Sequence, residues 1–145
     1  MKNRKVLVLV STLLIAVMSV LLVACTTADG LEKKFKNAGY DVTKVQGKAE
    51  DAYHWSVTAS KKGKLGALEN VPGVADLKKY AADFMATKYR SEEVAKSEEA
   101  TAKQVLAAAQ AFGQFKDRRV ERKGTVLYYG KNNELDYALG KKLSL

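Results

Sequence analysis

Hydrophobic and polar residues follow three different patterns along this chain. The residues from Val6 to Val23 are almost continuously apolar, with no charged side chain. Further along, apolar residues at spacings of three and four predict helices, and strict alternation predicts strands. The clearest alternation lies in residues 53–59, where Tyr53, Trp55, Val57 and Ala59 alternate with His54, Ser56 and Thr58. This segment therefore predicts a strand with one apolar and one polar face.

A short helix is predicted before this strand, over residues 31–38. Leu31, Phe35 and Ala38 share one helical face, and Gly39 is suited to end the helix in a left-handed conformation. Residues 40–46 then predict a further strand.

The middle of the chain contains the strongest turn signals. Residues 61–64, Lys-Lys-Gly-Lys, predict a turn, and Pro72-Gly73 is the clearest break. Residues 74–90 then allow two interpretations, either one continuous helix or a helix that ends near Ala82 followed by a strand over 84–89. We favour the strand.

Ser91 supports that choice, because it is a typical helix N-cap and is followed by Glu92 and Glu93. It opens an alanine-rich helix that is predicted to run to Phe112 and to stop at Gly113, with Glu92/Lys96 and Glu99/Lys103 pairs at i,i+4. The predicted core-facing stripe consists of Val94, Thr101, Val105, Ala108 and Phe112.

Residues 118–122 and 125–129 predict a β-hairpin around a two-residue loop, Lys123-Gly124, with glycine where a positive φ is needed. This loop would place Val120 opposite Leu127. It would likewise place Arg119 opposite Tyr128.

The order of the elements predicts a single α+β domain, with an antiparallel sheet of four or five strands, one long helix and short helices. Asn132 or Asn133 is expected to cap the last short helix, which ends at Leu139. Helix, glycine, strand and hairpin partner occur around both Gly39 and Gly113. This repetition suggests two αββ-like halves.

The N-terminal run is organised as a secretory signal. A basic segment, residues 1–5, precedes the apolar run, which ends at Leu22-Val23-Ala24-Cys25 and contains the only cysteine. These four residues resemble the lipobox of bacterial lipoproteins. The resemblance implies attachment of diacylglycerol to Cys25 and cleavage before it.

By this resemblance, residues 1–24 are a signal peptide, residues 25–30 a lipidated tether and residues 31–145 the folded domain. The alternatives to lipidation are that the apolar run forms an uncleaved membrane helix, or that Cys25 is a buried structural cysteine. Cys25 lies directly before the polar segment 26–30, which favours lipidation. The expected location is the extracytoplasmic face of the cell membrane.

A second resemblance covers short motifs of the remaining chain: Gly39-Tyr40 after a helix, Tyr89-x-Ser91-x-Glu93, and Lys123-Gly124 followed by Tyr128-Tyr129-Gly130. They are similar to small, mostly uncharacterised lipoproteins of Gram-positive bacteria. The resemblance implies a Gram-positive membrane and brings no catalytic residues.

His54 is the only histidine, so a site with two histidine ligands to a metal is excluded. A hydrolase would need His54 as general base beside Ser56 or Ser60, and no orienting carboxylate is evident. The sequence also lacks a glycine-rich phosphate loop. We therefore expect no enzymatic activity, no metal and no cofactor.

Positive charge is the remaining chemical signal. Residues 1–24 hold three of the 25 basic residues and none of the 16 acidic ones, so residues 25–145 carry about +6. Arg118, Arg119, Arg122 and Lys123, with Tyr128 across the hairpin, form a candidate anion-binding strip. The alternative is that these arginines only keep the hairpin soluble.

The expected function is a non-enzymatic, lipid-anchored binding, adaptor or structural module of the envelope. The alternative is a binder of lipid headgroups or anionic wall polymer through the basic hairpin. The expected partners are the membrane, through Cys25, and an envelope protein or anionic polymer, not nucleic acid.

Overall fold

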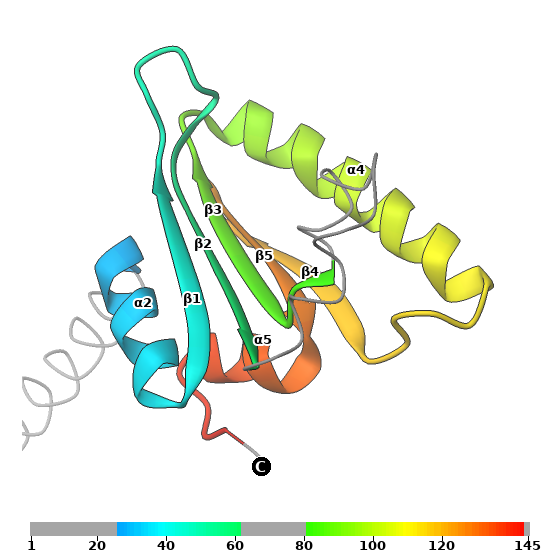
Figure 1. The fold of residues 1–145 in the computed structure, drawn as a ribbon. Coiled ribbons are helices and arrows are strands. Elements are labelled where there is room, and N and C mark those ends of the chain that lie inside the picture. Colours follow the sequence, from blue (N-terminus) through cyan, green and yellow to red (C-terminus); the bar gives the residue numbers. More distant parts are fainter. Residues whose placement is uncertain (1–25, 62–80, 144–145) are drawn as a thin grey trace, which may run out of the picture.

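Five antiparallel strands form one sheet in the order β1-β2-β3-β5-β4 in a computed structural model of the chain (Figure 1). The structure describes residues 26–61 and 81–143. The strands are β1 (Tyr40–Gln46), β2 (Tyr53–Lys61), β3 (Phe84–Tyr89), β4 (Arg118–Lys123) and β5 (Val126–Lys131). The helices are α2 (Ala28–Asn37), α4 (Glu92–Ala111) and α5 (Asn132–Ala138). The predicted α+β class with an antiparallel sheet is confirmed.

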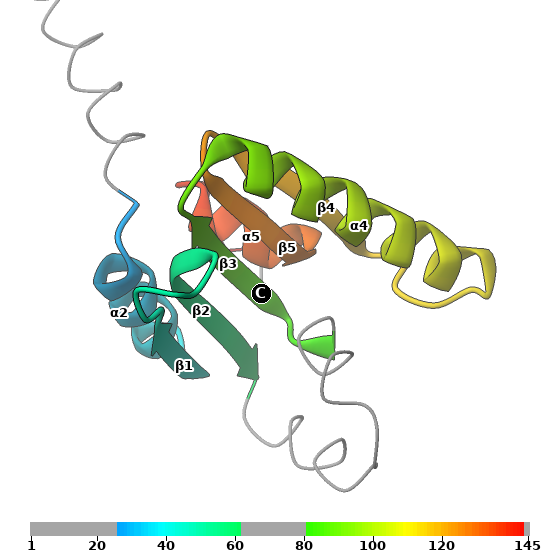
Figure 2. The same ribbon diagram turned by 90° about the horizontal axis from the view of Figure 1, so that it is seen from above.

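Helices cover both faces of this sheet. Figures 1 and 2 show α2 on one side of the sheet and α4 on the other, with α5 beneath the sheet on the side of α2. The alternation in β2 explains the core on the α2 side, because Trp55, Val57 and Ala59 all point into it. Phe35 lies at its centre, with its ring stacked on Phe84 at 4.5 Å between centroids.

A second, smaller core lies on the α4 side. Met85, Leu127 and Tyr129 come from β3 and β5 and pack against Ala102 and Leu106 of α4. The small alanine side chain lets the helix backbone approach the sheet closely.

The two predicted αββ-like halves are visible in the topology. The segments α2-β1-β2 and α4-β4-β5 flank the central strand β3, and each helix packs against its own hairpin. Gly39 and Gly113 follow the two helices with φ values of 84° and 77°. Both glycines therefore end a helix in the left-handed conformation that the sequence predicts. The two helices lie on opposite faces of the sheet (Figure 2).

Several predicted boundaries are confirmed. The strand β1 occupies the predicted residues, and residues 84–89 form the strand β3 rather than part of a helix. The Ser91 side chain caps α4 by accepting a hydrogen bond from the Val94 amide at 3.2 Å.

The predicted tether is shorter than expected. The helix α2 begins at Ala28 rather than Leu31, because the Thr27 hydroxyl accepts a hydrogen bond from the Gly30 amide at 3.0 Å and caps the helix. Ala28 is buried in the core. Residues 28–30 thus belong to the folded domain.

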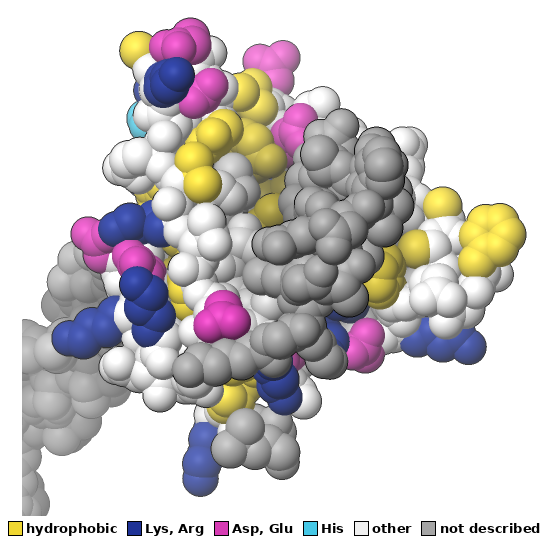
Figure 3. Space-filling view, in the orientation of Figure 1, with side chains coloured by type: hydrophobic (Ala, Val, Ile, Leu, Met, Phe, Trp, Pro, Cys, Tyr) yellow, Lys and Arg dark blue, Asp and Glu magenta, His cyan; other side chains and the backbone are white. Residues whose placement is uncertain are grey.

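The predicted core-facing stripe of α4 is confirmed for Val105, which packs against the smaller core, and is wrong for three other members. The residues that α4 buries are Ala95, Ala102 and Leu106, whereas Thr101 and Ala108 are exposed. Phe112 is 85% exposed, and Figure 3 shows hydrophobic atoms standing out at the C-terminal end of this helix. An alanine-rich helix has few large apolar residues to define a face, and this explains the error.

The hairpin register also differs from the prediction. Lys123 pairs with Val126, so the loop is Gly124-Thr125 and not Lys123-Gly124. Val120 consequently lies opposite Tyr129, and Arg119 lies opposite Gly130. Gly124 keeps the expected positive φ, 57°.

The last helix begins without the predicted asparagine cap. Its N-cap residue is Lys131, which makes no side-chain capping bond, and the helix ends at Ala138 rather than Leu139.

Four predictions lie wholly or largely outside the described residues: the signal peptide with Cys25, residues 62–64 of the predicted turn, the Pro72-Gly73 break, and the helix predicted from residue 74 to about Ala82. In residues 26–61 and 81–143, no helix is both long and apolar enough to cross a membrane.

Candidate binding groove beside the first strand

The helix α4 covers only part of its face of the sheet. It packs on β4, β5 and β3, and it leaves the β1–β2 side of this face without a helix in the described part of the chain. Hydroxyl side chains occupy this uncovered part: Ser56 lies beside Thr87, and Thr58 lies between Thr43 and Met85. The polar face predicted for β2 therefore faces a gap that α4 does not fill.

This gap is a groove of about 410 Å³ between α4 and the strands β1 to β3. Figure 3 shows hydrophobic side chains in the hollow beside the β1–β2 turn. The described residues that line the groove are Val45, Ala52, Tyr53, Ser56, Thr58, Met85, Thr87, Tyr89, Glu98, Ala102 and Leu127.

Tyr53 reaches the groove because of an irregularity in β2. The register between β2 and β3 shifts between Tyr53 and Trp55, so the two side chains no longer share a face. The alternation of the sequence predicts Tyr53 on the apolar face with Trp55. That prediction is wrong, because Tyr53 lines the groove while Trp55 is in the core.

Gly47 makes this local arrangement possible. A Cβ atom at Gly47 would lie 2.1 Å from the carbonyl oxygen of Tyr53, so only glycine fits here. The Gly47 amide donates a hydrogen bond to the His54 carbonyl oxygen at 2.9 Å and closes the β1–β2 turn.

The groove offers hydrogen bonds and aromatic surface rather than positive charge. The Ser56 and Thr87 hydroxyls lie 3.0 Å apart and share a hydrogen bond. Tyr53 and Tyr89 contribute their rings, and Glu98 is the only charged side chain among the described lining residues. Such a lining suits a neutral or cationic ligand that presents hydrogen-bonding groups, and it disfavours an anion.

The groove opens beside an edge strand. β1 is the first strand in the sheet order, and the side chain of Val45 on it is 45% exposed. The Gly47 amide points toward β2, where it is hydrogen-bonded to His54. In an antiparallel pair, the amides of alternate residues point to opposite sides of the strand, so those of Val42, Lys44 and Gln46 point away from β2. These groups can receive a further strand.

Sequence reasoning did not single out these lining residues as a site. The signal was present in the alternating serine and threonine side chains of β2. Their pairing with Thr87 required the sheet order, which the sequence does not reveal.

The structure does not bring His54 together with a serine. His54 is exposed and does not line the groove. The Ser56 hydroxyl is bonded to Thr87, and the Ser60 hydroxyl accepts a hydrogen bond from the Asp83 amide at 3.4 Å. The geometry required of a general base is therefore not formed among these residues.

The residues of the predicted anion-binding strip do not share one surface. Arg118 is buried and donates to the Ala82 carbonyl oxygen, and Tyr128 is buried in the core on the α2 side. Arg122 points to the opposite face, where its Nε lies 2.7 Å from Glu99. Alternate residues of a strand point to opposite faces, which separates Arg119 from its neighbours.

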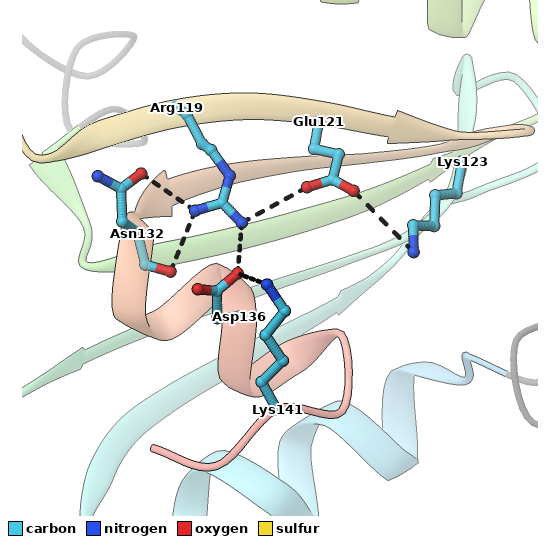
Figure 4. A network of polar contacts seen from close by, with 6 residues as sticks. All are labelled: Arg119, Glu121, Lys123, Asn132, Asp136 and Lys141. Atoms are coloured by element: carbon cyan, nitrogen blue, oxygen red, sulfur yellow. Dashed lines mark hydrogen bonds and ion pairs between the residues drawn. The ribbon is translucent and has the colours of Figure 1, made fainter. Parts of the chain in front are cut away.

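Arg119 lies in a network with the last helix (Figure 4). It donates to Asp136 at 2.7 Å and to the Asn132 side chain at 3.1 Å, and Glu121 lies 3.5 Å away. Hydrogen bonds from Arg119 and Lys141 lower the pKa of Asp136. Arg119 is thus already paired with carboxylates of the protein itself.

No group of three or more potential metal ligands from His, Cys, Asp and Glu is found within the two described ranges. No protein-family model matches the chain, and no curated protein and no solved structure matches it either.

Proposed function

We propose that this protein is a non-enzymatic binding module, anchored to the extracytoplasmic face of the membrane through a lipid on Cys25. Its ligand is an extended segment of another envelope protein. That segment adds to the edge of β1 and places alternate side chains in the groove.

One observation carries this proposal: β1, which pairs with no strand other than β2 in the described part of the chain, borders the groove. Strand addition supplies main-chain hydrogen bonds along β1, and the groove supplies side-chain selectivity. Val45 belongs to both, because it lies on the edge strand and lines the groove. Glu98 favours a neutral or basic segment, since a carboxylate in the partner would face another carboxylate.

Photocrosslinking in intact membranes tests the ligand. A benzophenone amino acid at Val45 is expected to link the protein to a partner of defined mass. The matched control is the same amino acid at Thr101, which is exposed on α4 and does not line the groove. A second variant, Gln46→Pro, removes an outward amide of the edge and should abolish the Val45 crosslink.

Equal crosslinking at Val45 and Thr101 would contradict the proposal. So would a Val45 crosslink that Gln46→Pro leaves unchanged, because strand addition needs the edge amides.

The lipid anchor has a separate test. Labelling with an alkyne fatty acid should modify the wild-type chain and not Cys25→Ala, and the variant should keep its leader. Normal processing of Cys25→Ala would contradict the proposed location.

The alternative, an anionic ligand on the basic hairpin, stays a prediction with less support. Arg119 and Arg122 lie close to carboxylates, and Arg118 is buried.

A further inference from the structure

The start of the described chain lies against one end of the sheet. Thr26 hydrogen-bonds through its side chain to Tyr128 of β5. Together they line a hollow of about 310 Å³ at the β4–β5 turn, which also includes Lys88, Lys123, Gly124, Thr125 and Val126. Thr26 follows Cys25 directly in the sequence.

Two lysines flank this hollow in one row across the sheet. Val126 pairs with Lys88 on one side and with Lys123 on the other. Neighbouring strands are about 4.8 Å apart, so the Cα atoms of the two lysines are separated by about 10 Å. Two lysine side chains at this separation are long enough for both ammonium groups to reach one phosphate group.

The hollow has more positive than negative charge. Lys88 makes no ion pair with any residue in the described ranges. Among the described residues, Lys123 pairs with a single carboxylate at the limit of an ion pair, with its Nζ 4.0 Å from Glu121 Oε1. This contrasts with Arg119 and Arg122, which lie 2.7 Å from their nearest carboxylates.

We infer that the end of the sheet around Lys88 and Lys123 faces the membrane and receives the phosphate of an anionic lipid headgroup. The inference rests on the proposed lipidation of Cys25, which holds Thr26 at the bilayer surface. The hydroxyl of Thr125 adds a hydrogen-bond donor beside the two lysines. Lysines near an anionic membrane surface each add attraction.

This arrangement fixes the orientation of the whole domain. The strand β5 runs from Val126 at the membrane end to Lys131 at the opposite end. Its six residues span about 17 Å. Asn133, which is exposed at the start of α5, then lies on the side away from the bilayer.

Paramagnetic broadening in nanodiscs tests the orientation. The lipidated full-length product is placed in phosphatidylglycerol nanodiscs that carry a gadolinium-chelate lipid, and amide signals are compared. The Gly124 amide is expected to broaden strongly and the Asn133 amide weakly. Lys88→Glu with Lys123→Glu should remove this difference, whereas the control pair Lys116→Glu with Lys142→Glu, both exposed, should keep it.

Equal broadening of the two amides in the wild-type protein would overturn the inference, as would an unchanged difference in the Lys88/Lys123 variant. Mass spectrometry of the same sample distinguishes a failure of the proposed function from a failure of this inference. A missing acyl chain on Cys25 contradicts the proposed function, whereas an acylated protein without the orientation contradicts only this inference.

Discussion

The Tyr40 hydroxyl donates a hydrogen bond to Glu134 Oε1 at 2.9 Å and thereby joins the first strand to the last helix. Glu134 is only 4% exposed, so its carboxylate depends on this partner. Burial and the bond to Glu134 raise the pKa of Tyr40, which remains a neutral donor.

Removing this donor is expected to destabilise the fold. Tyr40→Phe leaves a buried carboxylate without its partner, which costs about 1–3 kcal/mol in the free energy of unfolding. Urea denaturation measures this cost. Glu134→Gln keeps an acceptor for Tyr40 and should cost less. An equal loss in the two variants would show that the hydrogen bond is not the cause.

The face of α4 that enters the core can be tested by two substitutions. Leu106 is 7% exposed, so Leu106→Ala should lower the free energy of unfolding by about 2–5 kcal/mol. Phe112 is 85% exposed, so Phe112→Ser should change it by less than about 0.5 kcal/mol. Thermal denaturation of both variants distinguishes the observed face from the one that the sequence predicts.

This helix illustrates how much of the fold the sequence predicts. Element types follow from local patterns, so the strands β1 and β3 and the cap at Ser91 are all predicted correctly. The face of α4 depends on packing against the sheet, and its alanines carry little directional information. The position of Tyr53 depends on a register shift that alternation does not encode.

The candidate site is less predictable than the fold, because it depends on the packing of elements that are distant in the sequence. Charges that lie close together in the sequence, such as Arg118 and Arg119, point to opposite faces of β4. The groove, in contrast, joins Val45 to Glu98 across elements far apart in the chain. Such a site becomes visible only after the order of the strands is known.

Gly130 is expected to tolerate no side chain. A Cβ atom there would lie 2.4 Å from the Asp83 carbonyl oxygen and 2.8 Å from the Phe84 Cα, both of which are backbone atoms. Gly130→Ala should therefore prevent folding or displace β3. Gly124→Ala meets no atom within 4 Å and strains only the backbone, so it should cost about 1–2 kcal/mol. Circular dichroism and thermal melting compare the two variants, and equal stability would contradict the close approach of β5 to β3.

Acid should weaken the contact between α2 and β1. Hydrogen bonds from Lys36 and Lys44 lower the pKa of Glu32 from 4.5 to about 2. Because the folded pKa is the lower one, the stabilisation is present above about pH 4.5 and is lost as the pH falls towards 2.

The melting temperature of Glu32→Gln should therefore fall less than that of the wild type between pH 5 and pH 2. Glu93→Gln, at an exposed position on α4, serves as the control. Parallel pH profiles of Glu32→Gln and the wild type would show that this ion pair does not contribute.

Hydrogen exchange along β1 measures whether a partner strand binds to this edge of the sheet. The outward amides of Val42, Lys44 and Gln46 should exchange quickly in the detergent-purified protein and slowly in native membranes that contain the partner. The opposite edge strand, Arg118–Lys123, serves as the internal reference. Protection confined to β1, and lost in Gln46→Pro, is the predicted result. Identical deuterium uptake of β1 in both preparations would contradict binding by strand addition.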